Sequence, residues 1–234
     1  LSQLSEMILP LPEQMPRDDL MHLIFPNVKD AGLSGVSVEN LIYLFSISDE
    51  TGNKESYFLY EKKDVQISGF EFTDIRQIRD TEMDFMYKVM AMMTAKHLAD
   101  WYRDTKFCGR CRCKTVHSKT ERAMICSNEG CGYTMYPRIM PAVIVGVIND
   151  DKLLLTKYRK GYANNALVAG FTEIGETLEE TVAREVMEEA GLKVKNIRYY
   201  KSQPWGLAND ILTGFYCDVD GDTTIRLDEN ELKE

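Results

Sequence analysis

Three glutamates in the C-terminal half of the chain have the spacing of a shared helix face. Glu185, Glu188 and Glu189 are three and four residues apart, so a helix with about 3.6 residues per turn places them side by side. Like charges at this spacing repel by roughly 0.2–0.5 kcal/mol per pair in an exposed helix, and bound cations reverse that penalty. Carboxylate clusters suit Mg²⁺ or Mn²⁺, which prefer oxygen ligands and bridge to phosphates. The spacing therefore predicts a metal-dependent site for phosphate chemistry.

The residues around these glutamates indicate the element that positions them. We expect a helix over about residues 176–189. An adjacent face of this helix is apolar and is expected to bury against a sheet, through Val182, Val186, Met187 and Ala190. Gly191 has the residue type of a C-terminal cap. Glu176 is expected to pair with Arg184 if the loop before the helix folds back.

Five of the six cysteines lie between residues 108 and 131. In a chain without an export signal, such a cluster predicts a metal site in the reducing cytoplasm rather than a set of disulfides. Four thiolates on two hairpin knuckles can surround a structural zinc ion, and the expected ligands are Cys108, Cys111, Cys126 and Cys131. Gly132 suits a knuckle that needs a positive φ. Arg112 stands where the first knuckle would have a glycine, and Cys113 is a spare thiol that could compete as a ligand.

The segment around the cysteines is basic in an otherwise acidic chain. Residues 103–122 hold seven lysines and arginines against two acids, whereas the whole chain has a net charge of −9. That net charge excludes broad nucleic-acid affinity. Two interpretations of the basic segment stay open. The cations offset the negative charge of a four-thiolate zinc centre, or they form a phosphate- or RNA-facing patch that charge reversal of Arg110, Arg112 and Lys114 would weaken.

The rest of the chain gives a coarse organisation. Residues 41–47 and 57–60 read as strands around a turn at residues 50–53, which predicts a hairpin. A helix is expected over residues 82–103, with Thr81 as its N-cap and a core-facing stripe of Met83, Met86, Met90, Met93, His97 and Trp101. A buried strand is expected at residues 142–148, and after a turn a second strand is expected at residues 152–157.

The chain shows no feature of a membrane or secreted protein. No apolar run approaches the roughly 18 residues of a membrane span, and the N-terminus has no basic region followed by an apolar stretch. We therefore expect no signal peptide and no membrane partner. The chain begins with Leu1 rather than methionine, which suggests that it is trimmed.

The glutamates belong to a longer pattern, G-x5-E-x7-R-E-U-x-E-E-x-G-U, in which U is apolar. A glutamate-rich helix is usually only a solvated face, but here nine spaced positions fit: Gly170, Glu176, Arg184, Glu185, Val186, Glu188, Glu189, Gly191 and Leu192. This stretch resembles the Nudix box. The resemblance implies hydrolysis of a nucleoside diphosphate that is linked to another group.

Downstream of this box, residues 202–205 read SQPW. A Nudix box followed by SQPW and preceded by a zinc ribbon resembles the NADH pyrophosphatase family, which also removes NAD caps from RNA. The resemblance covers roughly residues 97–234. It implies a zinc ribbon (105–136) and a Nudix α/β/α sandwich (137–234). Together with the small α+β domain ending in a helix that the sequence pattern predicts (1–104), this gives a mixed α/β chain. It also implies a homodimer and a further C-terminal helix, which the sequence ending at Glu234 does not show.

The resemblance assigns roles to particular residues. The Mg²⁺ or Mn²⁺ ligands are expected to be Glu185, Glu188, Glu189, Glu231 and the main-chain oxygen of Ala169. Of the helix glutamates, Glu188 is favoured over Glu189 as the group that orients or deprotonates the attacking water. The walls of a nicotinamide pocket are expected to be Phe171, Tyr136 and Trp205. Further substrate contacts are expected from Ser202, Gln203, Pro204, Arg76 and Glu121, the last reaching across a dimer.

The implied reaction splits NAD(H) into nicotinamide mononucleotide and AMP, and it leaves a 5′-monophosphate on NAD-capped RNA. The sequence departs from the family after SQPW, where residues 206–210 read GLAND instead of Pro-Phe-Pro-x-Ser. The change removes two prolines, and Asp210 replaces a hydroxyl with a negative charge. ADP-ribose or another dinucleotide therefore stays open as a substrate. An alternative of another class is a zinc-ribbon RNA-binding or regulatory protein with an inactive Nudix fold.

Overall fold

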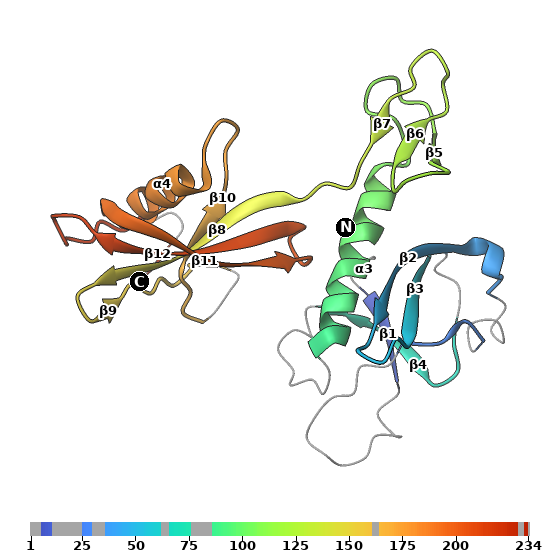
Figure 1. Ribbon diagram of the computed structural model, residues 1–234, viewed down its shortest axis with the longest axis horizontal. Helices are drawn as coiled ribbons and strands as arrows, with labels where there is room; N and C mark the ends of the chain where they lie inside the picture. The colour runs from blue at the N-terminus through green and yellow to red at the C-terminus, as the bar shows by residue number, and fades with distance from the viewer. Residues whose placement is uncertain are drawn as a thin grey trace. The chain divides into compact units, whose positions relative to one another are not determined.

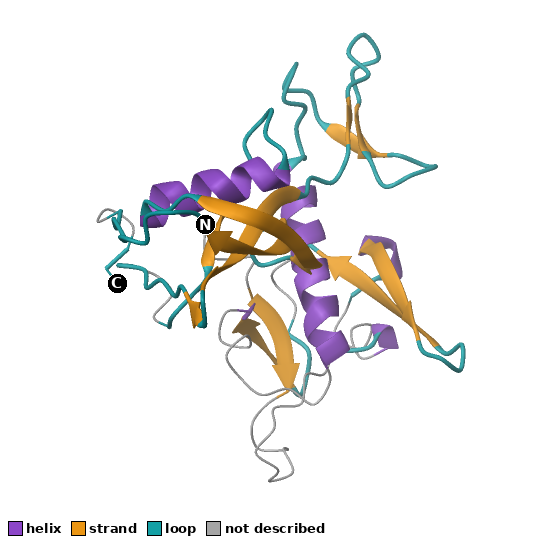
Figure 2. Ribbon diagram, turned by 60° about the vertical axis from the view of Figure 1, so that its left-hand side comes forward, coloured by secondary structure: helices purple, strands orange, loops and turns teal. Residues whose placement is uncertain are grey.

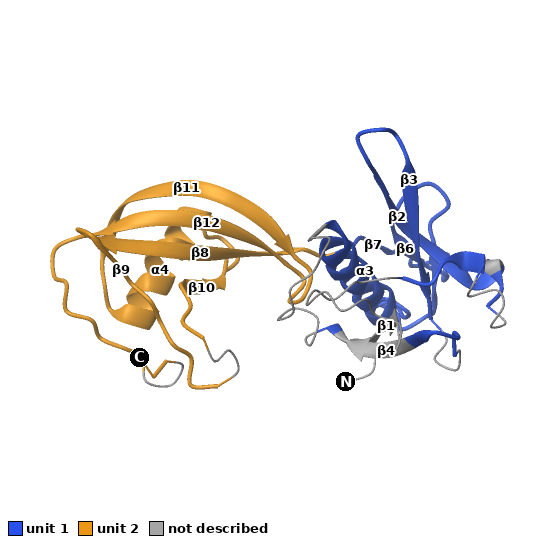
Figure 3. Cartoon of the chain, turned by 90° about the horizontal axis from the view of Figure 1, so that it is seen from below, with its two compact units in different colours: residues 1–137 blue, residues 138–234 orange. Residues whose placement is uncertain are grey.

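The computed structural model describes residues 6–10, 25–29, 36–61, 66–75, 86–160, 164–228 and 232–233. Figure 1 shows its helices and strands. The chain divides into two compact units, residues 1–137 and residues 138–234 (Figure 3). Each unit is described below by itself. Among the residues named above, Arg76, Thr81, Met83 and Glu231 lie outside the described residues.

Two antiparallel strand pairs form the sheets at the start of unit 1. They join β1 (Glu6–Pro10) to β4 (Phe70–Asp74), and β2 (Leu41–Ser48) to β3 (Lys54–Tyr60). Between β2 and β3, the Asp49 carboxylate accepts hydrogen bonds from the amides of Thr51 and Asn53, each at 2.9 Å. Gly52 in the same turn has a φ of 88°, a value that glycine adopts without steric cost. The predicted hairpin is confirmed.

A 19-residue helix, α3 (Met86–Asp104), follows these strands. Its predicted stripe is partly confirmed, because Met93 and Trp101 are buried while Met90 and His97 are half-buried. The helix ends at Asp104, and the next residue, Thr105, donates from both its amide and its hydroxyl to the carbonyl oxygen of Trp101, at 3.0 Å and 2.6 Å.

The cysteine-rich ribbon shares a core with this helix. Its strands are β5 (Thr115–His117), β6 (Met124–Cys126) and β7 (Thr134–Met135). The shared core combines the helix, the ribbon and β2, and its buried members are Leu44, Trp101, Tyr102, Met124 and Met135. Arg122 of the ribbon also donates a hydrogen bond to the main-chain oxygen of Leu44. The ribbon is therefore packed as part of unit 1.

Unit 2 is built on a five-stranded sheet with the order β10-β8-β12-β11 and with β9 paired to β8. Its strands are β8 (Met140–Asn149), β9 (Lys152–Leu153), β10 (Val168–Phe171), β11 (Val194–Trp205) and β12 (Asp210–Val219). Strand β12 runs parallel to β8, and the other pairs are antiparallel. The strand predicted at residues 152–157 is shorter than expected. The mixture of helix and strand visible in Figure 2 confirms the expected fold class.

Helix α4 (Leu178–Ala190) packs on one face of this sheet. Alternate residues of β8 point toward the helix, as a strand of period two requires, and they bury against its apolar side. This core includes Val143, Val145, Val147, Val182, Val186 and Ala190. The expected burial of Met187 is wrong, because it is 40% exposed; one residue beyond Val186, the helix has already turned this side chain away from the sheet.

Within the described residues of unit 2, α4 is the single helix, so the second helical layer of the expected sandwich is not seen among them. None of the helices in the described part of the chain has the length and apolar character needed to span a membrane.

Candidate functional site

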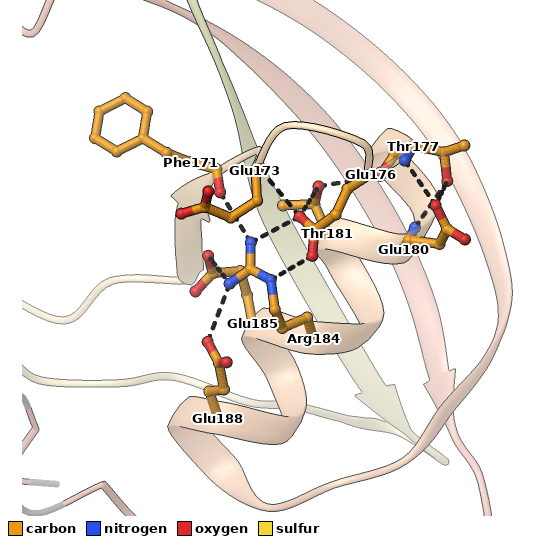
Figure 4. Close-up of polar contacts among 9 residues, drawn as sticks. All are labelled: Phe171, Glu173, Glu176, Thr177, Glu180, Thr181, Arg184, Glu185 and Glu188. Carbon is orange, nitrogen blue, oxygen red and sulfur yellow. Dashed lines mark hydrogen bonds and ion pairs between the residues drawn. The ribbon is translucent and has the colours of Figure 1, made fainter.

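Arg184 connects glutamates of α4 and of the loop before it to the preceding strand (Figure 4). Its guanidinium donates to both carboxylate oxygens of Glu176, from Nε at 2.6 Å and from Nη2 at 2.9 Å. Nη1 donates to Glu185 at 2.7 Å and to Glu188 at 3.0 Å. Nη2 also donates to the main-chain oxygen of Phe171 at 2.9 Å. The predicted pairing of Glu176 with Arg184 is therefore confirmed, and it is one part of a larger network.

Glu176 fixes the loop that leads into the helix. Besides the arginine, its carboxylate accepts hydrogen bonds from the amide of Glu173 at 3.1 Å and from the hydroxyl of Thr181 at 3.0 Å. The hydrogen bond from Arg184, followed by the bond from the Glu173 amide, lowers the pKa of Glu176 to about 2. Glu176 is therefore ionised at neutral pH and acts as a permanent brace for the loop.

Both ends of α4 are capped. The Thr177 hydroxyl accepts a hydrogen bond from the amide of Glu180, and the Glu180 carboxylate accepts one from the amide of Thr177 at 2.7 Å. This capping box sets the helix start at residue 178 rather than near 176, and sequence reasoning missed it although a threonine three residues before a glutamate is its signature. The predicted C-terminal cap is confirmed, because Gly191 has a φ of 68° and its amide bonds to the Met187 carbonyl.

The glutamate face lies directly against β10. A Cβ atom built on Gly170 would lie 2.1 Å from the Glu185 carboxyl carbon, so a glycine is required here for that carboxylate to reach the strand. The three glutamates differ in burial, since the Glu185 and Glu188 side chains are 13% and 59% exposed and Glu189 is 3% exposed. Ala169 precedes Gly170 on this edge strand. Carboxylates that differ in burial therefore lie along one side of α4, and Glu185 reaches the strand where it has no side chain.

Four thiols of the ribbon form a second candidate metal centre. The Sγ atoms of Cys108, Cys111, Cys126 and Cys131 all lie within 4.8 Å of one another. Two of the pairs, Cys108 with Cys131 and Cys111 with Cys126, are 3.8 Å and 3.3 Å apart. Zinc bound tetrahedrally at about 2.3 Å from each sulfur separates the sulfurs by about 3.8 Å. The thiol arrangement therefore fits zinc, and Cys113 is not a member of it.

The backbone of both knuckles supports this arrangement. The Cys108 sulfur accepts a hydrogen bond from the amide of Arg110 at 3.4 Å. Gly132 has the expected positive φ of 54°, and Arg112, at the corresponding point of the first knuckle, has a φ of 63° despite its side chain. The Arg110 guanidinium lies over the Tyr133 ring at 4.0 Å. An arginine thus adopts the conformation for which a glycine was expected.

The sheet register arranges the residues expected to contact substrate. One row crosses four strands through residue pairs that are in register: Phe171, Ala142, Leu212 and Gln203. Three strand spacings place Phe171 and Gln203 about 14 Å apart on one face, and Trp205, two residues further along β11, lies on that face too. Ser202 and Pro204 alternate to the other face. The predicted contacts from β11 are therefore divided between both faces of the sheet.

Comparison with known proteins identifies the domain that holds this arrangement. A family model described as the NUDIX domain matches residues 138–234. Residues 138–234 are a Nudix domain. The boundary of this match coincides with the start of unit 2, and the match confirms the expected Nudix resemblance.

Relatives of known sequence resemble this chain beyond the Nudix domain. The "NAD-capped RNA hydrolase NudC" of Shigella dysenteriae is 49% identical over 141 residues, which cover 58% of this chain and 52% of the relative. The protein of the same name from Escherichia coli K12 is 48% identical with the same coverage. The chain thus spans about half the length of the curated relatives it matches. A solved NUDIX hydrolase of Nitrosomonas europaea is 23% identical, with a TM-score of 0.47, and covers 55% of this chain and 76% of that chain.

Not all predicted site residues belong to the Nudix domain. Tyr136 and Glu121 lie in unit 1, where the Tyr136 hydroxyl donates to the Glu121 carboxylate at 3.2 Å. The Nudix domain itself supplies the three helix glutamates, Ala169, Phe171 and the residues of β11. Arg76 and Glu231 lie outside the described residues. Sequence reasoning missed the bond from Arg184 to the Phe171 carbonyl, which no spacing rule would have indicated.

Proposed function

We propose that the Nudix domain hydrolyses the pyrophosphate bond of NAD(H) to nicotinamide mononucleotide and AMP in the presence of Mg²⁺ or Mn²⁺. On NAD-capped RNA the same reaction would leave a 5′-monophosphate end. The observation that carries the proposal is the glutamate face of α4, ordered by Arg184 against β10. The similarity to proteins named NAD-capped RNA hydrolase supports the choice of substrate.

The residues present fit a divalent cation. Glu185, Glu188, Glu189, Glu231 and the main-chain oxygen of Ala169 would hold it, and all of these are the oxygen donors that Mg²⁺ and Mn²⁺ prefer. Gly170 leaves the space that the Glu185 carboxylate needs beside the strand. When bound, the cation supplies positive charge to the diphosphate and makes water a stronger acid.

Glu188 and Glu189 would have different roles in the reaction because they differ in exposure. Glu188, with a side chain that is 59% exposed, can accept a proton from the attacking water at the surface of the site. Glu189 is buried, at 3% exposure, and would help to hold the cation in place. Arg184 neutralises part of the carboxylate charge before a cation arrives and holds the Phe171 carbonyl, so the strand and the helix keep their spacing. In-line attack on phosphorus then releases the two mononucleotides.

Aromatic side chains would bind the nicotinamide ring. Phe171 is 49% exposed and follows directly after the glycine that contacts Glu185. Its ring is therefore accessible for stacking, which favours flat heteroaromatic groups. Trp205 and Gln203 face the same side of the sheet. Tyr136 and Glu121 would complete the site, along with Arg76, in a homodimer.

Zinc in the ribbon would be structural, because all four ligand positions are thiols and no position remains open for a substrate. The six cysteines are free thiols in the structure. Thiolate ligands require a reducing compartment to stay available for zinc. We therefore place the protein in the cytoplasm.

ADP-ribose is a second candidate substrate, and Asp210 favours it. Asp210 is 5% exposed and pairs in register with Trp205 on β11 and with Met140 on β8. Its carboxylate can accept hydrogen bonds from sugar hydroxyls, and the terminal ribose of ADP-ribose offers more of them than a nicotinamide ring does.

A product assay with NADH, ADP-ribose and NAD-capped RNA side by side tests the proposal. We expect Mg²⁺-dependent AMP release from NADH with a kcat/KM above that for ADP-ribose, and 5′-monophosphate RNA from the capped substrate. Replacing Asp210 by Ser should increase the NADH preference. A higher kcat/KM for ADP-ribose would move the assignment to the second candidate. Absence of hydrolysis on all three substrates would instead support an inactive, RNA-binding or regulatory Nudix protein.

A further inference from the structure

A hollow in unit 1 combines cations and aromatic rings, and the proposed reaction does not use it. Its volume is about 320 Å³, and it lies where β2, the end of α3 and the ribbon meet. The residues that determine its chemistry are Glu61, Tyr102, Lys106, Phe107, Lys114 and His117. All of them belong to residues 1–137, so the hollow lies within one compact unit.

The backbone places two lysines at the rim of this hollow. Phe107 and Lys114 form an antiparallel bridge, and the amide of Thr115 bonds to the Lys106 carbonyl at 3.2 Å. Lys106 and Lys114 therefore come from paired segments and converge on the same space. Glu61 pairs with Lys106 at 3.1 Å, and both side chains are exposed, so this ion pair is weak and open to competition by a ligand anion. Two cations facing one replaceable carboxylate favour an anionic ligand.

Aromatic surface lies beside these charges. Phe107 is 59% exposed, although burial of a phenylalanine side chain stabilises a folded protein. The rings of Tyr102 and His117 pack at 5.2 Å on the wall of the hollow. Exposed rings interleaved with lysines are the means by which proteins hold nucleotide bases by stacking and their phosphates by charge.

We propose that this hollow binds one nucleotide, an aromatic base that carries a phosphate. The base would stack on Phe107, and the phosphate would displace Glu61 from Lys106 and contact Lys114. Such a nucleotide is either free in solution or part of a single-stranded RNA. The site goes beyond the proposed hydrolysis and does not depend on it, because none of its residues belongs to the Nudix domain.

Binding of two probes to the zinc-loaded full chain tests this proposal. The probes are AMP and a 5′-phosphorylated adenosine hexanucleotide, measured by isothermal titration calorimetry without added Mg²⁺. We expect Phe107→Ala and Lys114→Glu each to weaken binding about tenfold. Glu61→Gln should strengthen it, because it frees Lys106. Lys119→Glu, an exposed charge on the same ribbon outside the hollow, is the matched control and should change nothing.

The two sources of the nucleotide give different results. Tight binding of both probes indicates a free nucleotide, whereas binding of the hexanucleotide alone indicates RNA. Zinc content and circular dichroism of each variant show that the ribbon is intact. Equal affinities in wild type, Phe107→Ala and Lys114→Glu would overturn the proposal. NADH hydrolysis, measured on the same samples, reports separately on the proposed function and should be unchanged in all four variants.

Discussion

The four thiols of the ribbon and the three glutamates of α4 are both proposed sets of metal ligands, but they are arranged differently. Among the described residues, only the thiols form a set whose ligand atoms already lie within 4.8 Å of one another. Two of the glutamates, Glu185 and Glu188, instead share one guanidinium nitrogen of Arg184. Short backbone knuckles hold the thiols in place, whereas the guanidinium of Arg184 offsets the negative charge of the carboxylates. A closed structural site and an adjustable catalytic site would differ in this way.

The largest expected effect is on the thiol set. Cys126→Ser should release zinc and unfold the ribbon, because structural zinc contributes on the order of 10 kcal/mol in zinc-finger peptides and Cys126 is buried. The core shared with α3 would be lost with it. Zinc content by atomic absorption and the thermal unfolding temperature measure the result. Cys113→Ser is the matched control and should retain zinc; equal zinc loss in both variants would show that Cys113 is a ligand.

On the glutamate set, Glu189→Gln should reduce kcat by about 10²–10³-fold while the fold stays intact. Glutamine keeps the shape of this buried side chain and removes only its charge. Steady-state kinetics with NADH and circular dichroism give the two readouts. Glu179→Gln, at the solvated first turn of the same helix, should leave kcat within about twofold. Retained turnover in Glu189→Gln would refute the role of this residue.

The glutamate site and the thiol site should respond differently when a glycine in each is replaced by alanine. Gly170→Ala should cost about 1–3 kcal/mol in the free energy of unfolding and should lower activity, because the new Cβ displaces the Glu185 carboxylate. Gly109→Ala in the first knuckle should be nearly neutral, because nothing lies within 4 Å of its added Cβ. Urea unfolding of both variants checks the contrast. Equal stability losses would contradict the close approach at Gly170.

Acid should weaken the brace at Glu176. Because the folded state lowers the pKa of this carboxyl from 4.5 to about 2, its stabilising contribution is fully present above pH 4.5 and is lost as the pH falls toward 2. Urea unfolding at pH 5 and pH 3 should therefore show a smaller loss of stability for Glu176→Gln than for wild type. Parallel losses in the two proteins would indicate that other groups dominate this pH range.

The smallest effect concerns the knuckles. Arg112→Gly should stabilise the ribbon by about 1 kcal/mol, because a left-handed conformation costs a residue with a side chain about that much. Gly132→Ala should have the opposite sign for the same reason. Thermal unfolding with zinc present measures both. A destabilised Arg112→Gly would show that the arginine side chain contributes more than its backbone conformation costs.

The sequence predicted the local parts of this structure well. The glutamate face, the thiol set, the β2–β3 hairpin and the Gly191 cap each depend on residues close together in the chain. The network of Arg184 was only partly foreseen, because its bond to the Phe171 carbonyl depends on how β10 and α4 pack. The burial of Met187 could not be predicted for a similar reason. Its side chain is apolar, but the way α4 packs on the sheet leaves it exposed.

The central claim is that the α4 glutamates support cleavage of a dinucleotide pyrophosphate. The most direct test is ³¹P nuclear magnetic resonance of NADH with the purified chain and Mg²⁺, with Glu189→Gln in parallel. Wild type should replace the pyrophosphate signals with those of two monophosphates, and the variant should leave them unchanged. Persistent pyrophosphate signals with wild type, or equal conversion by both proteins, would contradict the claim.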